Sequence, residues 1–194
     1  MKKIVGALLL MLGGLVFGSM GFAAEKATLG KNNFSVKVSS IHFDDGDTDN
    51  GISVSAEGYK EIEKNLYLGV EAGYTNVDGK VNLSGTRVDS DIVFLPIELN
   101  LKYAIRITNH LIVDFGIGGS YSYVKEEISR ADEWWESVDL DEWLFGGQCF
   151  ADVHVTIGKM IIGVNGKVQV TDKSRDAGKN YSNRRIGGHI GIMF

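Results

Sequence analysis

The sequence predicts an all-β protein, an eight-stranded antiparallel up-and-down transmembrane β-barrel, and three observations support this prediction. Apolar residues alternate with polar or small residues in about eight segments of ten or so residues, which suits a small membrane-spanning barrel. Short connections between these segments alternate with long polar ones. After residue 23, no run has the roughly eighteen consecutive apolar residues of a membrane helix, so a membrane crossing would need strands.

The N-terminal residues have the layout of a cleavable secretory signal. Two lysines precede an uncharged stretch at residues 4–17, and small residues follow it. Cleavage after Ala23 places small side chains at both recognition positions, whereas cleavage after Ala24 and a retained membrane anchor are alternatives. We therefore expect a signal peptide at residues 1–23 and a single barrel domain at residues 24–194. Losing two lysines changes the formal net charge from −5 to −7, which argues against nucleic acid as a partner.

The alternation defines the expected strands in chain order. In the stretch LYLGVEAGY, for example, Leu66, Leu68 and Val70 share one face, and Glu71 lies on the other with two glycines. The terminal stretch RRIGGHIGIMF alternates up to its last residue, which suggests a strand that is paired to its end, because unpaired termini fray. The expected strands are residues 34–43, 51–62, 66–74, 95–103, 111–123, 145–157, 161–170 and 184–194.

The connections predict a barrel whose two ends differ. Three are tight turns, at residues 64–65, 108–110 and 158–159, and four are long and polar, at residues 44–50, 75–91, 125–142 and 171–183. The apolar parity changes at residues 39–41 and again between Phe94 and Leu95, beside Pro96. A β-bulge accommodates both a parity change and the missing N–H of proline, so we expect one bulge at each place.

The face opposite the apolar one carries charges of both signs and many glycines. In a small barrel such groups can fill a polar interior by pairing, which leaves the apolar face towards lipid. A soluble barrel with an apolar lumen, such as a lipocalin, is the alternative. It does not explain the aromatic residues near the strand ends on the apolar face, Tyr103 and Phe194 at one end and Tyr74, Tyr121, Tyr123 and Trp143 at the other. The expected interior polar network is Glu71, Glu98, Lys102, Asp114, Gln148, Asp152, His154, Lys167 and His189.

The stretches PIELNLKY and VDFGIGGSYSYV, with a C-terminal strand ending in Phe194, resemble the small outer-membrane β-barrel proteins of Gram-negative bacteria. This is the group of the OmpA transmembrane domain, OmpX and OmpW. The resemblance covers essentially the whole chain after the signal, and its motifs are specific for architecture and poor for function. It implies an eight-stranded barrel that is exported through the periplasm to the cell outer membrane. It also implies that Phe194 is part of the signal read by the barrel assembly machinery, and that outer-membrane lipid and lipopolysaccharide are partners.

A hydrolase site is the catalytic hypothesis that the polar face raises. Asp152 and His154 are two residues apart on one strand, and an acid can orient a histidine base. The set lacks a convincing nucleophile, because no spacing links Ser120 or Ser122 to His154 or His189. We therefore expect a structural network and no enzyme, with a lipid A-modifying activity as the less favoured alternative.

The stretch DDGDTDNG has aspartates at alternate positions, as in a calcium loop. The glycine that an EF-hand requires comes one position late, at Gly51, and Ala56 stands where its glutamate would be. The single cysteine, Cys149, excludes an internal disulfide and is interpreted as a small apolar strand residue. We expect no metal site and no cofactor.

Two of the long connections suggest surface contacts. The acidic connection at residues 125–142 contains Trp134-Trp135, which would either contact a partner or pack over the barrel rim. Basic residues gather around the last connection, where they could pair with lipopolysaccharide phosphates. These residues are Lys173, Arg175, Lys179, Arg184 and Arg185.

These features predict a monomer with a structural or cell-surface interaction role, such as membrane integrity or adhesion, with the loops binding a host or surface ligand. A narrow channel for small solutes across the outer membrane is the alternative. Eight strands usually enclose an interior that side chains fill, which counts against an open pore.

Overall fold

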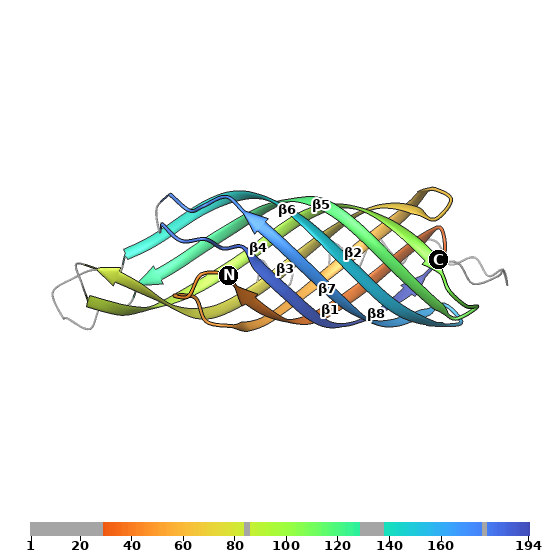
Figure 1. Ribbon diagram of the computed structural model, residues 1–194, viewed down its shortest axis with the longest axis horizontal. Coiled ribbons are helices and arrows are strands. Elements are labelled where there is room, and N and C mark those ends of the chain that lie inside the picture. The colour runs from red at the N-terminus through yellow and green to blue at the C-terminus, as the bar shows by residue number, and fades with distance from the viewer. Residues whose placement is uncertain (1–28, 84–85, 129–137, 176–177) are drawn as a thin grey trace.

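The computed structural model describes residues 29–83, 86–128, 138–175 and 178–194. The expected signal peptide and the Trp134-Trp135 pair lie outside these residues. Within them, eight antiparallel strands form one closed barrel, in which each strand pairs with its neighbours in sequence and β1 pairs with β8 (Figure 1). This is the predicted architecture. The strands are β1 (Asn32–Phe43), β2 (Gly51–Glu63), β3 (Leu66–Leu83), β4 (Thr86–Arg106), β5 (Leu111–Ile128), β6 (Val138–Ile157), β7 (Met160–Thr171) and β8 (Asn183–Met193).

Short turns close one end of the barrel, which we call the short-turn end, and the opposite end is the long-loop end. The turns follow β2, β4 and β6, as predicted. Asn65 and Gly158 have positive φ angles of 65° and 60°, a backbone region that asparagine and glycine adopt more readily than other residues. The last residue, Phe194, exchanges two backbone hydrogen bonds of 2.9 Å with Asn32 at this end. The chain is therefore paired up to its final residue.

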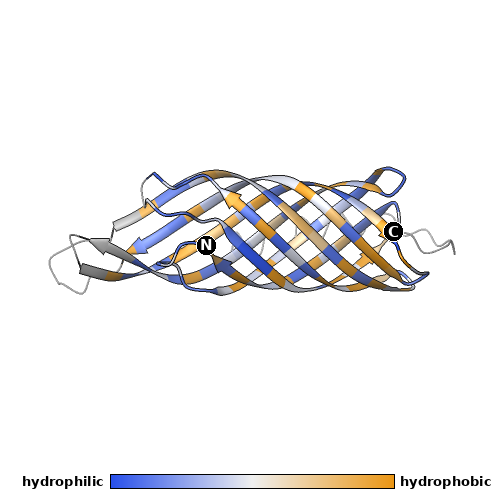
Figure 2. Ribbon diagram, viewed as in Figure 1, coloured by the Kyte–Doolittle hydropathy of each residue, from blue (hydrophilic) through white to orange (hydrophobic). Residues whose placement is uncertain are grey.

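The side chains alternate between the barrel interior and an apolar exterior. On β1, Val38 is 54 % exposed, whereas the neighbouring Lys37 is 1 % exposed. Figure 2 shows the resulting change between apolar and polar residues along the strands. Ile117 and Val164 are among many apolar side chains on the outer wall that are more than half exposed. A continuous apolar wall of this kind suits contact with lipid. No helix among the described residues has the length and apolar character that crossing a bilayer requires.

The β-bulges expected in β1 and β4 are absent. β1 pairs with both neighbours without a shift of register, and β4 pairs with β5 in one register along their whole contact. Ile41, Ile92 and Phe94 instead point into the barrel and are fully buried. The apolar parity changes because the interior becomes apolar towards the long-loop end, while the pleat of the strands continues. A register irregularity lies elsewhere, between Glu61 and Glu63 of β2.

The barrel interior has three layers along its axis. An apolar layer fills the short-turn end, a polar layer fills the middle, and a second apolar layer fills the long-loop end. The short-turn cluster consists of Leu29, Tyr59, Tyr67, Ala104, Ile112, Phe150, Ile161 and Met193. The long-loop cluster consists of Ile41, Phe43, Val77, Ile92, Phe94, Val124, Leu144 and Tyr181.

Four strands extend further at the long-loop end than the sequence predicted. β3 and β4 continue to residues 83 and 86, and β5 and β6 continue to residues 128 and 138, through stretches expected to be loops. Both hairpins reach beyond the other strands (Figure 1). These stretches also alternate, but their apolar residues, such as Val77 and Ile92, lie on the parity opposite to that of the lipid-facing residues of the same strands. The other parity is rich in charged residues, with opposite charges across the strands, as where Lys80 faces Asp89. The change of parity and the many charges led to their interpretation as polar loops. We call this extension of β3, β4, β5 and β6 the protruding sheet.

Candidate functional site in the barrel interior

The polar layer contains all nine residues that the sequence assigned to the interior. None of these residues is more than 6 % exposed. They come from six of the eight strands, β3 to β8. The layer is therefore assembled only when strands far apart in sequence close into one barrel.

Lys167 on β7 is the centre of one set of buried ion pairs. Its Nζ lies 2.7 Å from Glu71 Oε2 and 2.5 Å from Glu98 Oε2. Glu71 and Glu98 face each other directly across β3 and β4, an arrangement that would repel if both were ionised without a cation between them. Arg185 approaches the other oxygen of Glu98, at 3.4 Å. Two basic side chains thus hold two adjacent carboxylates inside the barrel.

Lys37 on β1 is the centre of a second set, which sequence reasoning missed. Its Nζ lies 2.8 Å from Glu57 on β2, 3.6 Å from Asp152 and 3.9 Å from Glu71. Lys37 and Glu57 were missed because β1 and β2 alternate less clearly than the other strands. The position of Lys37 between Val36 and Val38 was the available signal.

A third set joins two histidines to an acid. Asp114 Oδ2 lies 3.1 Å from Lys102 Nζ and 3.0 Å from His154 Nε2. His154 Nδ1 and His189 Nε2 are 2.9 Å apart, so an N–H of one ring donates to the other. The Lys102 ammonium also lies 3.9 Å from the centre of the Tyr59 ring, where a cation is attracted by the ring face. The short-turn cluster and the polar layer are therefore in direct contact.

The geometry of the polar layer favours a structural role. Buried charges are tolerated when partners and hydrogen bonds compensate their desolvation, and here the partners tie different strands together. Among the described residues, the hydrogen bonds and ion pairs of His154 and His189 lead to each other and to Asp114, and they include no serine hydroxyl. In the same part of the chain, no three His, Cys, Asp or Glu side chains are arranged to hold a metal ion.

The five basic residues expected to contact lipopolysaccharide divide into two groups. Lys173, Arg175 and Arg184 are exposed, and Arg184 lies 3.2 Å from Asp44 on the outer wall. Lys179 and Arg185 are only 7 % and 5 % exposed, because they turn into the barrel and pair with buried glutamates there. The expectation was wrong for these two residues. Alternation along β8 turns Arg185 inwards and the adjacent Arg184 outwards.

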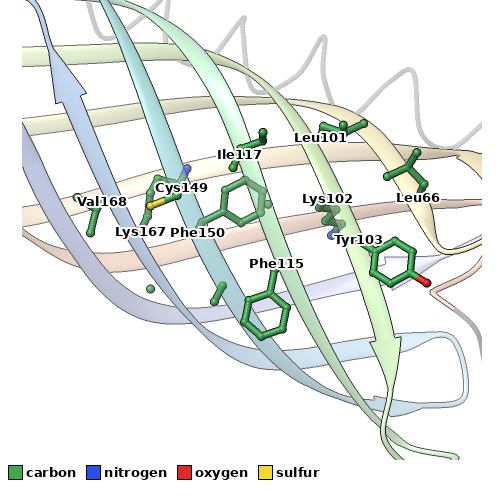
Figure 3. A pocket seen from close by; sticks show the side chains of 13 residues that line it. Leu66, Leu101, Lys102, Tyr103, Phe115, Ile117, Cys149, Phe150, Lys167 and Val168 are labelled. Atoms are coloured by element: carbon green, nitrogen blue, oxygen red, sulfur yellow. The ribbon is translucent and has the colours of Figure 1, made fainter.

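The outer wall carries an aromatic group and a shallow hollow. Tyr121 stacks on Trp143 with ring centres 4.5 Å apart, and the ring centre of Phe145 lies 4.6 Å from that of Tyr121. Nearer the short-turn end, an open hollow of about 600 Å³ runs across β4 to β7. Figure 3 shows Phe115 and Tyr103 at this hollow. Both features lie on the outer wall rather than in the barrel interior.

Known proteins share this architecture. The family model described as "Outer membrane protein beta-barrel domain" matches residues 7–194. The fold is similar to that of a major outer membrane protein from Thermus thermophilus, with a TM-score of 0.61 and 10 % identity over 84 % of this chain and 99 % of that chain. It is also similar to the outer membrane protein OprG from Pseudomonas aeruginosa, with a TM-score of 0.58 and 14 % identity over 87 % and 100 %. Neisserial surface protein A has a TM-score of 0.53 and 12 % identity over 84 % and 96 %.

A comparison with curated protein sequences finds no match. The structural similarities, at such low identity, concern the fold alone. The family match covers nearly the whole chain and agrees with the closed barrel and its apolar outer wall. The chain therefore belongs to the family of outer membrane β-barrel proteins, and it resides in the outer membrane.

Proposed function

We propose that this protein is a closed barrel that acts at the cell surface, by contact or adhesion, and supports membrane integrity. In bacterial barrels the short turns face the periplasm and the longer loops face outwards, so the long-loop end is the extracellular side. The observation that carries the proposal is the filled interior. Tyr67 in one apolar cluster and Tyr181 in the other are at most 1 % exposed, and Glu98 between them is equally buried.

The protruding sheet supplies the surface for contact. Among the described residues, β6 pairs with β7 only from Gly146 onwards, whereas residues 138–144 pair with β5 alone. The other side of the protruding sheet is covered, since Thr48 bridges to Gly79 on β3. The β7–β8 connection contacts this edge at the Glu142 side chain, which accepts from Arg175 N–H at 3.0 Å, but its described residues form no strand there. An edge without a strand partner presents backbone N–H and C=O groups that can add an extended strand from another protein.

One hydrogen bond shows which backbone N–H and C=O groups of β6 point to the open edge. Asp172 N–H donates to the Phe145 carbonyl at 2.8 Å, so the backbone groups of Phe145 point away from β5. Backbone groups alternate in direction along an antiparallel strand, so those of Trp143 and Asp141 also point to the open edge. Substitution at Asp141 can therefore alter the edge without removing a hydrogen bond to β5.

Asp141→Pro and Asp141→Ala form a matched pair that tests the surface role. Both variants remove the carboxylate, but only proline removes the edge N–H. We expect Asp141→Pro to reduce the adhesion of expressing cells to epithelial monolayers, and Asp141→Ala to reduce it less. The difference in migration between unboiled and boiled protein on a denaturing gel checks that both variants form barrels. Equal adhesion by both variants and wild type would overturn the proposed use of this edge.

A narrow channel for small solutes is the second candidate. Both carboxylate oxygens of Asp152 and the Nδ1 of His189 are buried without a hydrogen-bond partner among the described residues. Buried polar groups without hydrogen-bond partners in the protein are usually satisfied by ordered water, and a wet layer is what a channel would need. Planar-bilayer recordings separate the two candidates. Silence is expected for the closed barrel, and steady single-channel steps would favour transport.

We also propose that the protein is not an enzyme. A lipid A-modifying activity would require access of a lipid to His154, which is 2 % exposed inside the barrel. Incubation of purified barrel with lipopolysaccharide should therefore leave the mass spectrum of lipid A unchanged. A mass change that His154→Ala abolishes would refute this.

A further inference from the structure

The β7–β8 connection returns into the long-loop mouth of the barrel through residues 179–182, which we call the plug segment. Lys179 Nζ donates to Glu126 Oε1 at 2.5 Å, and the Tyr181 hydroxyl donates to Glu126 Oε2 at 3.1 Å. Ser90 on β4 also donates to Oε1, at 2.5 Å. Glu126, which is 1 % exposed on β5, thus joins the plug segment to the inner wall on the far side of the mouth.

The Tyr181 ring covers the long-loop cluster. It is completely buried and meets Phe43 edge to face, with ring centres 6.3 Å apart. Phe43 in turn meets Phe94 edge to face at 5.7 Å. Burial and the adjacent Glu126 carboxylate raise the pKa of Tyr181, so the phenol keeps its proton and remains a donor.

The two ends of the plug segment are held differently. At Ser182, the carbonyl accepts from Asp44 N–H at 2.8 Å and the hydroxyl accepts from Thr171 N–H at 3.1 Å, which fixes this end to β1 and β7. Before the other end, Gly178 has a φ of 67°, and an added Cβ there would meet no atom within 4 Å. The Lys179 carbonyl accepts from Ser174 N–H at 2.9 Å, which joins this end to an earlier part of the same connection and not to the barrel wall. Apart from Ser182, the side chains of the segment that join it to the wall of the mouth are Lys179 and Tyr181, through Glu126.

We propose that the plug segment is a reversible closure of the extracellular mouth, with Glu126 as the latch that holds it shut. This inference rests on the proposed function, because it adds a means of opening the outer part of an otherwise filled barrel. The latch to the barrel wall is ionic, whereas the backbone pairing of the segment, between Lys173 and Asn180, lies within the same connection. When it opens, Glu126 and Lys179 regain water, which offsets part of the lost contact, while exposure of the long-loop cluster opposes opening.

A cysteine reporter inside the mouth tests the latch. The native thiol is removed as Cys149→Ser, and Val124→Cys places a thiol of similar size in the long-loop cluster, where Val124 is 4 % exposed. Folded protein in vesicles is treated from outside with a membrane-impermeant maleimide. We expect Lys179→Glu, which sets two carboxylates against each other, to accelerate labelling at least about tenfold. Glu127→Gln, on the outward face next to the latch, should leave labelling unchanged.

The charge swap Glu126→Lys with Lys179→Glu distinguishes a latch from a folding defect. The swap restores an attractive pair, so slow labelling should return, which a misfolded variant would not show. Rapid labelling of the reporter with the native latch, or unchanged labelling in Lys179→Glu, would overturn the inference. The proposed function is judged separately by conductance: a wild type that conducts overturns the closed barrel whatever the labelling shows.

Discussion

Replacing Lys167 by methionine tests whether buried ion pairs hold the barrel interior together. Removing one partner of a buried pair typically costs about 3–5 kcal/mol, because an uncompensated charge is left behind. Here Glu98 retains Arg185 at 3.4 Å and Glu71 retains Lys37 at 3.9 Å. We therefore expect the lower end of this range, about 3 kcal/mol, which is on the order of a hundredfold in the unfolding equilibrium. Methionine keeps most of the side-chain length, so the cavity contribution stays small.

Urea unfolding of the barrel refolded in lipid vesicles, followed by tryptophan fluorescence, measures this loss. The midpoint should fall at an unchanged slope if the native and unfolded states keep their exposed surfaces. Lys173→Met, on the exposed connection, is the control and should change the free energy of unfolding by less than about 0.5 kcal/mol. Adding Glu98→Gln to Lys167→Met should recover at least about 1 kcal/mol, since it removes one of the stranded charges. A loss below about 1 kcal/mol for Lys167→Met would refute the reasoning.

Three further predictions concern the interior packing and the two ends of the barrel. Gly116→Ala should cost about 1–3 kcal/mol in the same titration, because its Cβ would overlap the buried Phe150 ring inside the barrel. Gly166→Ala, whose Cβ would meet no atom within 4 Å, should change stability by less than about 0.5 kcal/mol, and equal losses would contradict the packing argument. Deleting Phe194 should lower the amount of assembled barrel in cell envelopes several-fold while purified protein still refolds in detergent; unchanged envelope levels would count against an assembly signal. Arg184→Glu should reduce the lipopolysaccharide that copurifies with the barrel relative to Lys64→Glu at the short-turn end, and equal retention would argue against a phosphate contact.

The barrel could be predicted because the membrane imposes a simple pattern. Wherever lipid lies on one side of a strand, that side must be apolar, and strands such as β4 and β5 carry the signal over most of their length. Where lipid ends, the apolar residues change to the inward parity and charged residues face outwards, so the extra strand residues of the protruding sheet were taken for loops. The bulge predictions were wrong for a related reason. The argument assumed a uniformly polar interior, whereas Ile41 and Phe94 face inwards near the mouth.

The candidate site could be predicted only as a set of inward positions. Parity selected nine residues, but it could not say that Lys167 would meet Glu71 and Glu98 from the other side of the barrel, because such contacts depend on barrel closure and strand stagger. Parity along β8 did contain the information that Arg185 points inwards. The prediction of a lipopolysaccharide contact gave more weight to the cluster of basic residues around the last connection than to this parity. Lys179 offered no such signal, because its burial comes from an irregular connection that returns into the mouth.

The seam between β1 and β8 governs when this protein can fold. Its pairing runs from Asn33 with Met193 to Phe43 with Asn183, so it joins residues about 140 to 160 positions apart. Contacts this distant in sequence form late and slowly, because the chain between them must first be ordered. Until β8 is in place, β1 and β7 both present bare edges that can pair with other chains. The barrel can therefore close only after β8 has been synthesised, and a chain that lacks its last strand is a candidate for aggregation rather than a smaller barrel.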